Sequence, residues 1–159
     1  MGIDFGQRRT GVALSDPTAT LASPLTTLQR RTGKRPPLKQ LEALARTHEV
    51  VQIVVGLPLD LHGRETAWCR EVQSAGDELA RRLRVPVGYV DERFTSVRAG
   101  RIVREIGLPR EVRSRKDRVD RVAAAIILQG WLDSGGETER STPHADRPPE
   151  DPGNGGDRA

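Results

Sequence analysis

The order in which strand-like and helix-like segments follow one another limits this chain to few architectures. Two short opening strands are expected at residues 3–5 and 11–14, and a third at 21–28, where Pro24 favours the edge of a sheet. Helical and strand-like patterns alternate after these three strands. Antiparallel opening strands followed by β-α alternation predict a mixed sheet with helices on both faces, in the order βββαβαβαα.

The later elements are defined by their hydrophobic periods. Apolar residues recur every three or four positions in the predicted helices, and β-branched or apolar runs mark the predicted strands. The predicted helices are about 38–45, 68–83, 95–105 and 118–133, the strands 50–55 and 85–90, and the basic loops 30–37 and 107–117. In the last helix, the residues expected to face inward are Val119, Val122, Ala123, Ile126 and Ile127.

Residues 134–159 differ in composition from the rest of the chain. Nine of these 26 residues are Gly or Pro, and their only apolar side chains are two alanines, too little apolar surface to offset the entropy of ordering. We therefore expect a folded domain over 1–133 and a disordered tail over 134–159. The chain has 26 basic and 22 acidic residues; without the six acids and three arginines of the tail, the domain carries a net charge of +7.

The same composition favours a cytoplasmic protein. Cys69 is the only cysteine, so no disulfide framework and no cysteine-based zinc site can form. No stretch approaches the roughly 18 apolar residues of a membrane span, and the first residues lack the pattern of a signal peptide. We expect a reducing compartment and no membrane partner, and the basic domain is compatible with a nucleic-acid partner.

Acidic residues occupy three places in the chain where a site could form. Asp4 interrupts an apolar opening strand, and a charge there is costly unless it is paired or binds a metal. Asp91 and Glu92 directly follow the strand at 85–90, and because adjacent residues point to opposite faces, only one of them can face a given site. Asp120 lies near the start of the last helix, close to its apolar stripe.

Each carboxylate also has an ordinary structural interpretation. Asp4 could cap a turn, and Asp91 or Glu92 could pair with Arg93 at a solvated strand end. The helix dipole favours carboxylates in a first turn, which accounts for Asp117 and Asp120 alike.

If the three carboxylates meet at one edge of the sheet, they form a site with hard oxygen ligands. Mg²⁺ or Mn²⁺ prefers such ligands, and these ions support hydrolysis of phosphodiesters. The three histidines, His48, His62 and His144, have no zinc-site spacing, and Ser15 lacks the context of a serine nucleophile.

Basic residues gather between positions 98 and 121. They are Arg98, Arg101, Arg104, Arg110, Arg113, Arg115, Lys116, Arg118 and Arg121. The first three recur every third position and share a helix face, which leads toward Asp120. Such a track suits a phosphodiester substrate, although a merely solvated helix face has the same pattern.

The opening strands allow a second interpretation. The segment 2–6 and the segment 10–13 could form a strand, a glycine turn and a second strand that cradle phosphates, as in sugar kinases and actin-like ATPases. Those folds clamp a nucleotide between two such domains, and the length of this chain argues against that arrangement.

Taken together, four motifs resemble the YqgF/RuvX family of Holliday-junction-resolvase-like proteins, also described as pre-16S rRNA nucleases. The matching residues are Gly2-Ile3-Asp4-Phe5-Gly6 with Arg9-Thr10-Gly11-Val12-Ala13 and Ser15-Asp16; Val54-Val55-Gly56-Leu57-Pro58 with Gly63 and Thr66; Val90-Asp91-Glu92-Arg93-Phe94-Thr95-Ser96; and Val119-Asp120 with Ala123-Ala124, Ile127-Leu128-Gln129 and Trp131-Leu132. The resemblance covers about residues 2–133.

The resemblance implies a ribonuclease-H-like fold and cleavage of nucleic acid that depends on Mg²⁺ or Mn²⁺. It implies processing of the 5′ end of 16S rRNA as the role, with Asp4, Glu92 and Asp120 as catalytic and metal-binding residues. Residues expected to contact nucleic acid are Arg8, Arg9, Arg93, Arg98, Arg101, Arg104, Arg115 and Lys116. Residues expected in the loops around the site are Gly6, Thr10, Gly11, Ser15, Asp16, Gly56, Pro58, Thr95 and Ser96.

Two alternatives remain on the same fold: a Holliday junction resolvase that acts on branched DNA, and a non-catalytic nucleic-acid-binding factor in ribosome assembly or transcription. The first differs from an rRNA nuclease in its substrate, and the second does not need all three acids. The expected partner is pre-rRNA or branched DNA, and the protein could be a monomer or a homodimer.

Overall fold

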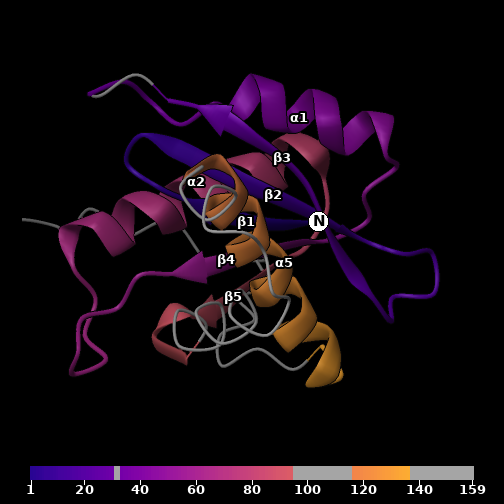
Figure 1. The fold of residues 1–159 in the computed structure, drawn as a ribbon. Coiled ribbons are helices and arrows are strands. Elements are labelled where there is room, and N and C mark those ends of the chain that lie inside the picture. Colours follow the sequence, from indigo (N-terminus) through magenta and orange to yellow (C-terminus); the bar gives the residue numbers. More distant parts are fainter. Residues whose placement is uncertain (31–32, 95–115, 137–159) are drawn as a thin grey trace, which may run out of the picture.

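Five strands form one mixed sheet in the order β3-β2-β1-β4-β5 (Figure 1). The strands are β1 (Gly2–Phe5), β2 (Arg9–Ser15), β3 (Ala22–Gln29), β4 (Ile53–Leu57) and β5 (Val87–Asp91). β1, β2 and β3 pair in antiparallel fashion, whereas β4 pairs in parallel with both β1 and β5. The predicted edge position of the third strand and the predicted mixed sheet are confirmed.

Three helices and one short turn complete the described fold. They are α1 (Leu38–Thr47), α2 (Ala67–Leu83), the 3-10 turn η1 (Glu92–Phe94) and α5 (Lys116–Asp133). The computed structural model describes residues 1–30, 33–94 and 116–136. The helix predicted over 95–105, nearly all of the basic loop at 107–117 and the tail from 137 onward lie outside these residues. No helix within the described ranges is long and apolar enough to cross a membrane.

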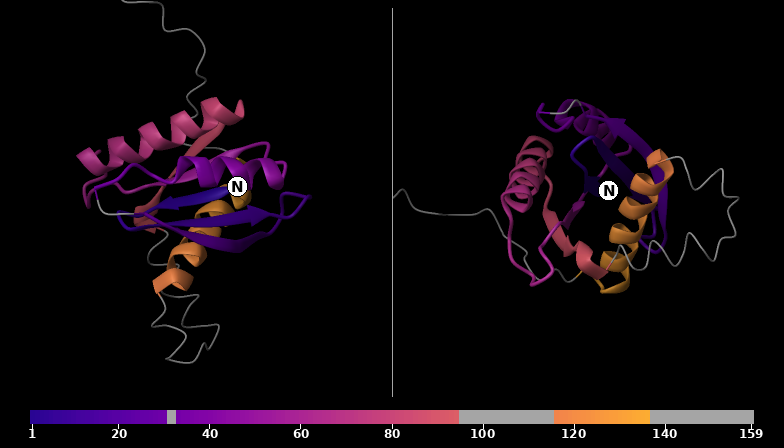
Figure 2. Two further views of the ribbon diagram at one scale, coloured as in Figure 1. Left: turned by 90° about the horizontal axis from the view of Figure 1, so that it is seen from above. Right: turned by 60° about the vertical axis from the view of Figure 1, so that its left-hand side comes forward.

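Alternating side chains of the sheet build two apolar cores. Val12 and Val55 face α1 and α2, and their neighbours Ala13 and Val54 face α5. Figure 2 shows the sheet as the middle layer, with α5 on one side and the other two helices on the opposite side. The predicted arrangement with helices on both faces is therefore confirmed.

The strands β4 and β5 begin later than the sequence predicted, at residue 53 instead of 50 and at residue 87 instead of 85. The residues just before each strand instead form the C-terminal turn of the preceding helix. Glu49 has φ 50° and the N–H of Val50 donates to the Ala45 carbonyl at 2.9 Å; Arg84 has φ 57° and the Val85 N–H donates to the Ala80 carbonyl at 3.1 Å. Both turns have the hydrogen bond of a Schellman motif, which ends a helix in the left-handed conformation.

The residues through which helix α5 packs on the sheet only partly match the predicted set, of which Ile126 and Ile127 are buried as expected. Its buried residues are Ala124, Ala125, Ile126, Ile127 and Leu128. The predicted inward residues Val122 and Ala123 are only partly buried, and the side chain of Val119 is outside the described part. The reason is close contact with β1: a Cβ atom on Gly2 would lie 2.8 Å from the Ala124 carbonyl oxygen and 2.7 Å from the Leu128 Cβ.

Candidate active site

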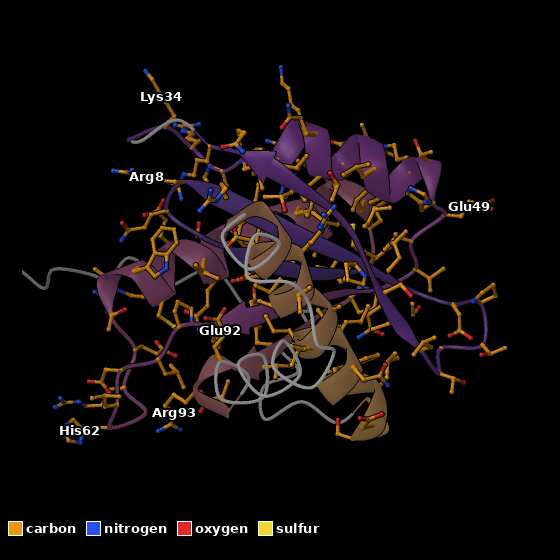
Figure 3. The ribbon with its side chains drawn as sticks, in the orientation of Figure 1. Arg8, Lys34, Glu49, His62, Glu92 and Arg93 are labelled. Atoms are coloured by element: carbon orange, nitrogen blue, oxygen red, sulfur yellow. The ribbon has the colours of Figure 1, made fainter. Side chains whose placement is uncertain are left out.

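The three carboxylates predicted to form a site come from separate elements. Asp4 lies in β1, Glu92 begins η1 directly after β5, and Asp120 lies in the first half of α5. Because β1, β4 and β5 are parallel, their carboxyl ends share one edge of the sheet, which we call the carboxylate edge. Figure 3 shows Glu92 on the side of the molecule that also carries Arg8 and Arg93.

Two glycines on neighbouring strands make room for the acidic residues. Asp4 pairs with Gly11 of β2, and the register of β1 with β4 continues to Gly56 on its other side. A Cβ atom on Gly56 would collide with the Glu92 carboxylate and lie 2.8 Å from its Cγ, and one on Gly11 would collide with the Asp120 carbonyl oxygen. This line of Gly11, Asp4 and Gly56, which we call the glycine row, lets Glu92 and Asp120 approach the sheet beside Asp4.

Asp4 and Glu92 form a partly buried pair of carboxyls that share a hydrogen bond. Burial and the nearby charge of Asp120 raise the pKa of Asp4 to about 6, although the hydrogen bond from Glu92 lowers it in part. Burial, followed by the charge and hydrogen bond of Asp4, raises the pKa of Glu92 to about 8. Near neutral pH, therefore, Glu92 holds a proton that it donates to ionised Asp4.

Asp120 has a cationic neighbour in Arg9. The Arg9 Nε lies 2.7 Å from the Asp120 Oδ2, and both side chains are about a quarter exposed. Arg9 begins β2, directly after the turn that follows Asp4, so the sheet itself delivers this guanidinium to the carboxylates. Asp120 thus has a cationic partner, in contrast to the pair of carboxyls beside it.

Asp91 and Glu92 point in different directions, as their adjacency predicted. The Asp91 carboxylate accepts from the Arg93 backbone N–H at 2.9 Å and from its Nε at 2.8 Å, and these bonds hold the pKa of Asp91 below its usual range. The Arg93 guanidinium also packs on Gly63 of the β4–α2 loop, where φ is +76° and a Cβ would lie 2.8 Å from Nη1. Asp91 therefore positions Arg93 and leaves Glu92 to face Asp4.

The other predicted residues of the first strands have different places. Gly6 closes the β1–β2 turn by donating its N–H to the Arg9 carbonyl at 2.8 Å, and Arg8 is exposed at the same turn. Thr10 is fully buried, but it shares the strand face of Val12, so its side chain points away from Asp4. Pro58 follows β4 at the carboxylate edge.

Ser15 and Asp16 do not border the carboxylates, contrary to the prediction that they line the site. β2 runs antiparallel to β1, so these residues lie at the opposite edge of the sheet from Asp4. The Asp16 carboxylate instead organises the β2–β3 turn, accepting from the backbone N–H groups of Thr20 at 2.8 Å and Leu21 at 2.9 Å. The physical reason is the strand direction: each residue after Gly11 moves the chain further from the site.

Several predicted residues cannot be placed. Those that lie outside the described residues are Thr95, Ser96, Arg98, Arg101, Arg104 and Arg115. Lys116 begins α5, but its side chain is also outside the description. The proposed track of basic residues therefore stays a prediction.

The basic segment 30–37 begins at this edge of the sheet, although the sequence predicted it only as a loop. The N–H of Arg30 donates to the Arg8 carbonyl at 2.8 Å, which places the start of the 30–37 loop beside the β1–β2 turn. The basic composition of residues 30–37 was the feature of the sequence that could have indicated a role at the site. The position of this segment next to the carboxylates followed only from the register of β3 with β2.

The donor set of the site fits a divalent metal ion. Asp4, Glu92 and Asp120 offer carboxylate oxygens, and a cation would relieve the repulsion that raises the first two pKa values. In the part of the chain that the structure describes, no three acidic, histidine or cysteine side chains already stand together in ligating geometry. Asp120 is engaged by Arg9, so its carboxylate must turn from that guanidinium to join the other two.

The buried acid pair should make the metal-free protein less stable as the pH rises. The pKa values of Asp4 and Glu92 lie above the values of about 4 expected in the unfolded chain. The folded state therefore binds protons that the unfolded state has lost, and the free energy of unfolding falls between about pH 4 and pH 8. The buried Met1 amine opposes this between pH 6 and 8, because desolvation lowers its pKa to about 6.

The variant Glu92→Gln separates these two contributions, since it leaves the amine intact. We expect its stability to decline less than that of the wild type between pH 5 and pH 8. Urea midpoints in EDTA buffer at the two pH values measure the difference. Equal declines in both proteins would contradict the raised pKa of Glu92.

The fold defines the class of protein. Two solved structures, titled "Thermus thermophilus RuvC structure" and "T. thermophilus RuvC in complex with Holliday junction substrate", each align with a TM-score of 0.54. Their sequence identities are 18% and 19%, over 85% of this chain and 95% and 94% of theirs. The sheet with its flanking helices therefore has the ribonuclease-H-like fold of these two structures, as predicted.

The sequence defines the family within that class. The family model RuvX, described as Holliday junction resolvase, matches residues 1–134, and the chain belongs to this family of nucleases, which hydrolyse phosphodiester bonds. Relatives called "Putative pre-16S rRNA nuclease" come from Roseiflexus sp., with 46% identity over 84% of this chain and 93% of that protein, and from Mycolicibacterium smegmatis, with 44% identity over 84% and 79%. A third, from Thermosynechococcus vestitus, has 38% identity over 89% and 92%.

Proposed function

We propose that the protein is an endonuclease dependent on Mg²⁺ or Mn²⁺ that processes the 5′ end of pre-16S rRNA in the cytoplasm. The observation that carries this proposal is the buried pair of Asp4 and Glu92 beside the glycine row, with Asp120 and its partner Arg9 next to it. The names of the relatives support the choice of RNA as substrate.

The three carboxylates share one task. Asp4, Glu92 and Asp120 would hold the ion, which would supply the Lewis acidity for activating a water and stabilising the leaving oxygen of the phosphodiester. Glu92 must first lose the proton that it shares with Asp4. Because the pKa of Glu92 is about 8, the ionised fraction of this carboxyl increases as the pH rises toward that value. We therefore expect ion affinity to increase with pH up to that value.

The arginines at the carboxylate edge would hold the substrate. Arg9 is partly exposed and already beside the acids, so turning from Asp120 would free its fork of N–H donors for a phosphate oxygen. Arg93 is held in place by Asp91 and faces the same side of the molecule (Figure 3). Both guanidinium groups would donate to the two non-bridging oxygens, which share the single negative charge of a phosphodiester.

A second candidate is resolution of branched DNA. It is favoured by the description of the RuvX family and by the likeness of the fold to RuvC. The same carboxylates would serve either substrate, because the phosphate and the ion are common to RNA and DNA.

The decisive experiment incubates the purified protein with pre-16S RNA and with a four-way DNA junction, each in Mg²⁺, Mn²⁺ or EDTA. We expect the RNA to be cut near its mature 5′ end in both metals and to stay intact in EDTA. Cleavage of the junction alone would favour the second candidate. Binding of RNA without cleavage of either substrate would overturn the proposal and favour a non-catalytic factor.

A further inference from the structure

A second basic surface begins at the carboxylate edge and extends along the opposite face of the sheet. It is a groove of about 750 Å³ between the β3–α1 loop, the start of α1 and one side of α2. Its charged lining residues are Arg30, Lys34, Arg35, Lys39 and Arg82 with Glu71 and Glu78. The groove thus carries five positive charges and two negative ones.

Two of the cations in this groove are neutralised by ion pairs and three are not. Arg30 pairs with Glu71, and Arg82 lies 2.8 Å from Glu78. Lys34, Arg35 and Lys39 are exposed, and none of them has an ion pair within the described residues. The uncompensated charge is therefore concentrated where the β3–α1 loop meets the first turn of α1.

Arg30 fixes this loop next to the active site. Its side chain is 7% exposed, lies 5.3 Å over the ring of Trp68, and donates from Nε to the Lys34 carbonyl at 2.7 Å. Its backbone N–H binds the Arg8 carbonyl, in the turn that leads from Asp4 to Arg9. Figure 3 shows the result: Arg8 and Lys34 are close neighbours on the side of the molecule that carries Glu92.

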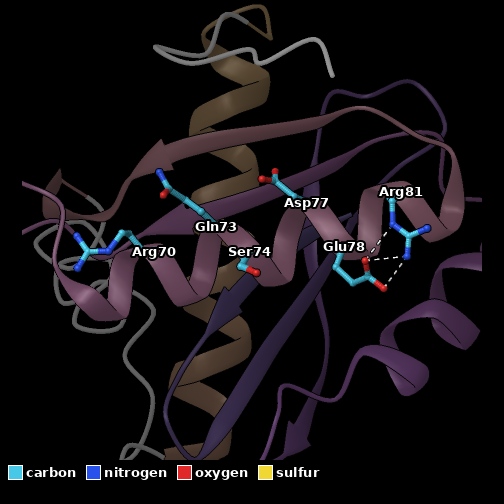
Figure 4. A pocket seen from close by; sticks show the side chains of 6 residues that line it. All are labelled: Arg70, Gln73, Ser74, Asp77, Glu78 and Arg81. Carbon is cyan, nitrogen blue, oxygen red and sulfur yellow. Dashed lines mark hydrogen bonds and ion pairs between the residues drawn. The ribbon is translucent and has the colours of Figure 1, made fainter. Parts of the chain in front are cut away.

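The outer face of α2 provides a contrast. A neighbouring hollow of about 450 Å³ is lined by Arg70, Gln73, Ser74, Asp77, Glu78 and Arg81. Figure 4 shows Arg81 paired with Glu78, the acid that also pairs with Arg82 of the groove. The lining of this hollow has two arginines and two acids. The excess of positive charge is a property of the groove and not of the whole helix surface.

We propose that this groove binds the sugar-phosphate backbone of the substrate strand beyond the scissile phosphate, a proposal that rests on the proposed nuclease function. Phosphates spaced along a strand match a row of exposed cations that starts at the site, whereas a single small anion would need only one of them. A strand that passes the carboxylates would continue past Arg8 to Lys34 and then into the groove toward Lys39.

The test compares two double variants that each remove two positive charges. The groove variant is Lys34→Ala with Lys39→Ala. The control variant is Arg46→Ala with Arg81→Ala, two exposed arginines outside the groove that pair with Glu42 and Glu78. Binding of a fluorescently labelled single-stranded RNA of about 30 nucleotides is measured in EDTA at several salt concentrations, so that no cleavage is needed.

We expect the groove variant to bind more weakly and its plot of log K against log salt to flatten by about 1.4, since each phosphate contact with a single strand contributes about 0.7 to the slope. The control variant should keep the wild-type slope. In Mg²⁺, the groove variant should show a raised KM with an unchanged kcat. Equal slopes in wild type and groove variant, equal losses in both variants, or no RNA binding by the wild type would each overturn the proposal.

The binding measurement and the cleavage assay distinguish a failure of the groove proposal from a failure of the nuclease function. If the protein binds RNA through the groove but cuts nothing, the proposed function is contradicted, and only the binding of a nucleic-acid backbone in the groove remains. If the wild type cuts RNA and the groove variant keeps the wild-type KM, the proposed function stands and the groove proposal is contradicted.

Discussion

Replacing Glu92 with Gln should abolish cleavage and at the same time stabilise the metal-free protein at neutral pH and above. The substitution removes a ligand charge, so the ion and the water that it activates are lost together; we expect a decrease in kcat/KM of more than about 100-fold, the upper end for residues that only support a metal ligand. Stability should rise because the folded state no longer has to keep a proton on Glu92, a carboxyl that is ionised in the unfolded chain at this pH. Asp4→Asn and Asp120→Asn should also abolish cleavage.

The matched control is Glu49→Gln, the same chemical change at an exposed residue. Glu49 lies beyond the end of α1, on the side of the molecule opposite Glu92 (Figure 3). Its cleavage rate should equal that of the wild type. Cleavage of pre-16S RNA and thermal melting in EDTA measure the two effects. Full activity in any of the three site variants would remove that residue from the proposed site.

Gly56→Ala should reduce cleavage almost as strongly, although alanine adds a single methyl group. The new Cβ would occupy the space of the Glu92 carboxylate and lie 2.6 Å from the Ile127 Cδ1. Glu92 has a flexible side chain, so it would turn away from Asp4, and the pair that defines the site would separate. We expect a loss of on the order of 100-fold in kcat/KM, consistent with the cost of a small misplacement of a catalytic group.

A glycine elsewhere provides the control for this substitution. Gly130 lies inside α5, and a Cβ atom there would meet nothing within 4 Å. Gly130→Ala should keep full activity and raise the free energy of unfolding by about 0.5–1 kcal/mol, because alanine favours the helix. Unimpaired cleavage by the Gly56→Ala protein would mean that Glu92 does not need its position over the glycine row.

Sequence patterns predicted the sheet and its two helical layers because the strand and helix periods differ clearly. They also predicted that only one residue of Asp91 and Glu92 could face the site, since alternation along an extended chain is a strict geometric rule. The starts of β4 and β5 were predicted too early for a physical reason. Glu49 and Arg84 adopt left-handed conformations that glycine usually provides, so the sequence contains no sign of the helix ends that occupy these positions.

The sequence predicted the acidic residues of the candidate site better than the residues around them. Asp4 was singled out as a charge in an apolar strand, whereas Ser15 and Asp16 were expected in the loops around the site on the basis of the resemblance. An antiparallel strand carries such residues away from their neighbours in sequence. The steric role of Gly11 and Gly56 could not be predicted, because it depends on the register of three strands and on what packs over them.

The distance along the chain between the acids has a consequence for synthesis. Asp4 is in the first strand and Asp120 in α5, the last described helix, which also covers Ala13 and Val54 on the sheet. A nascent chain in which α5 has not yet left the ribosome lacks one of the three carboxylates. One apolar face of its sheet is also uncovered. Since domains generally fold as units during synthesis, the proposed site is complete only after α5 has been made.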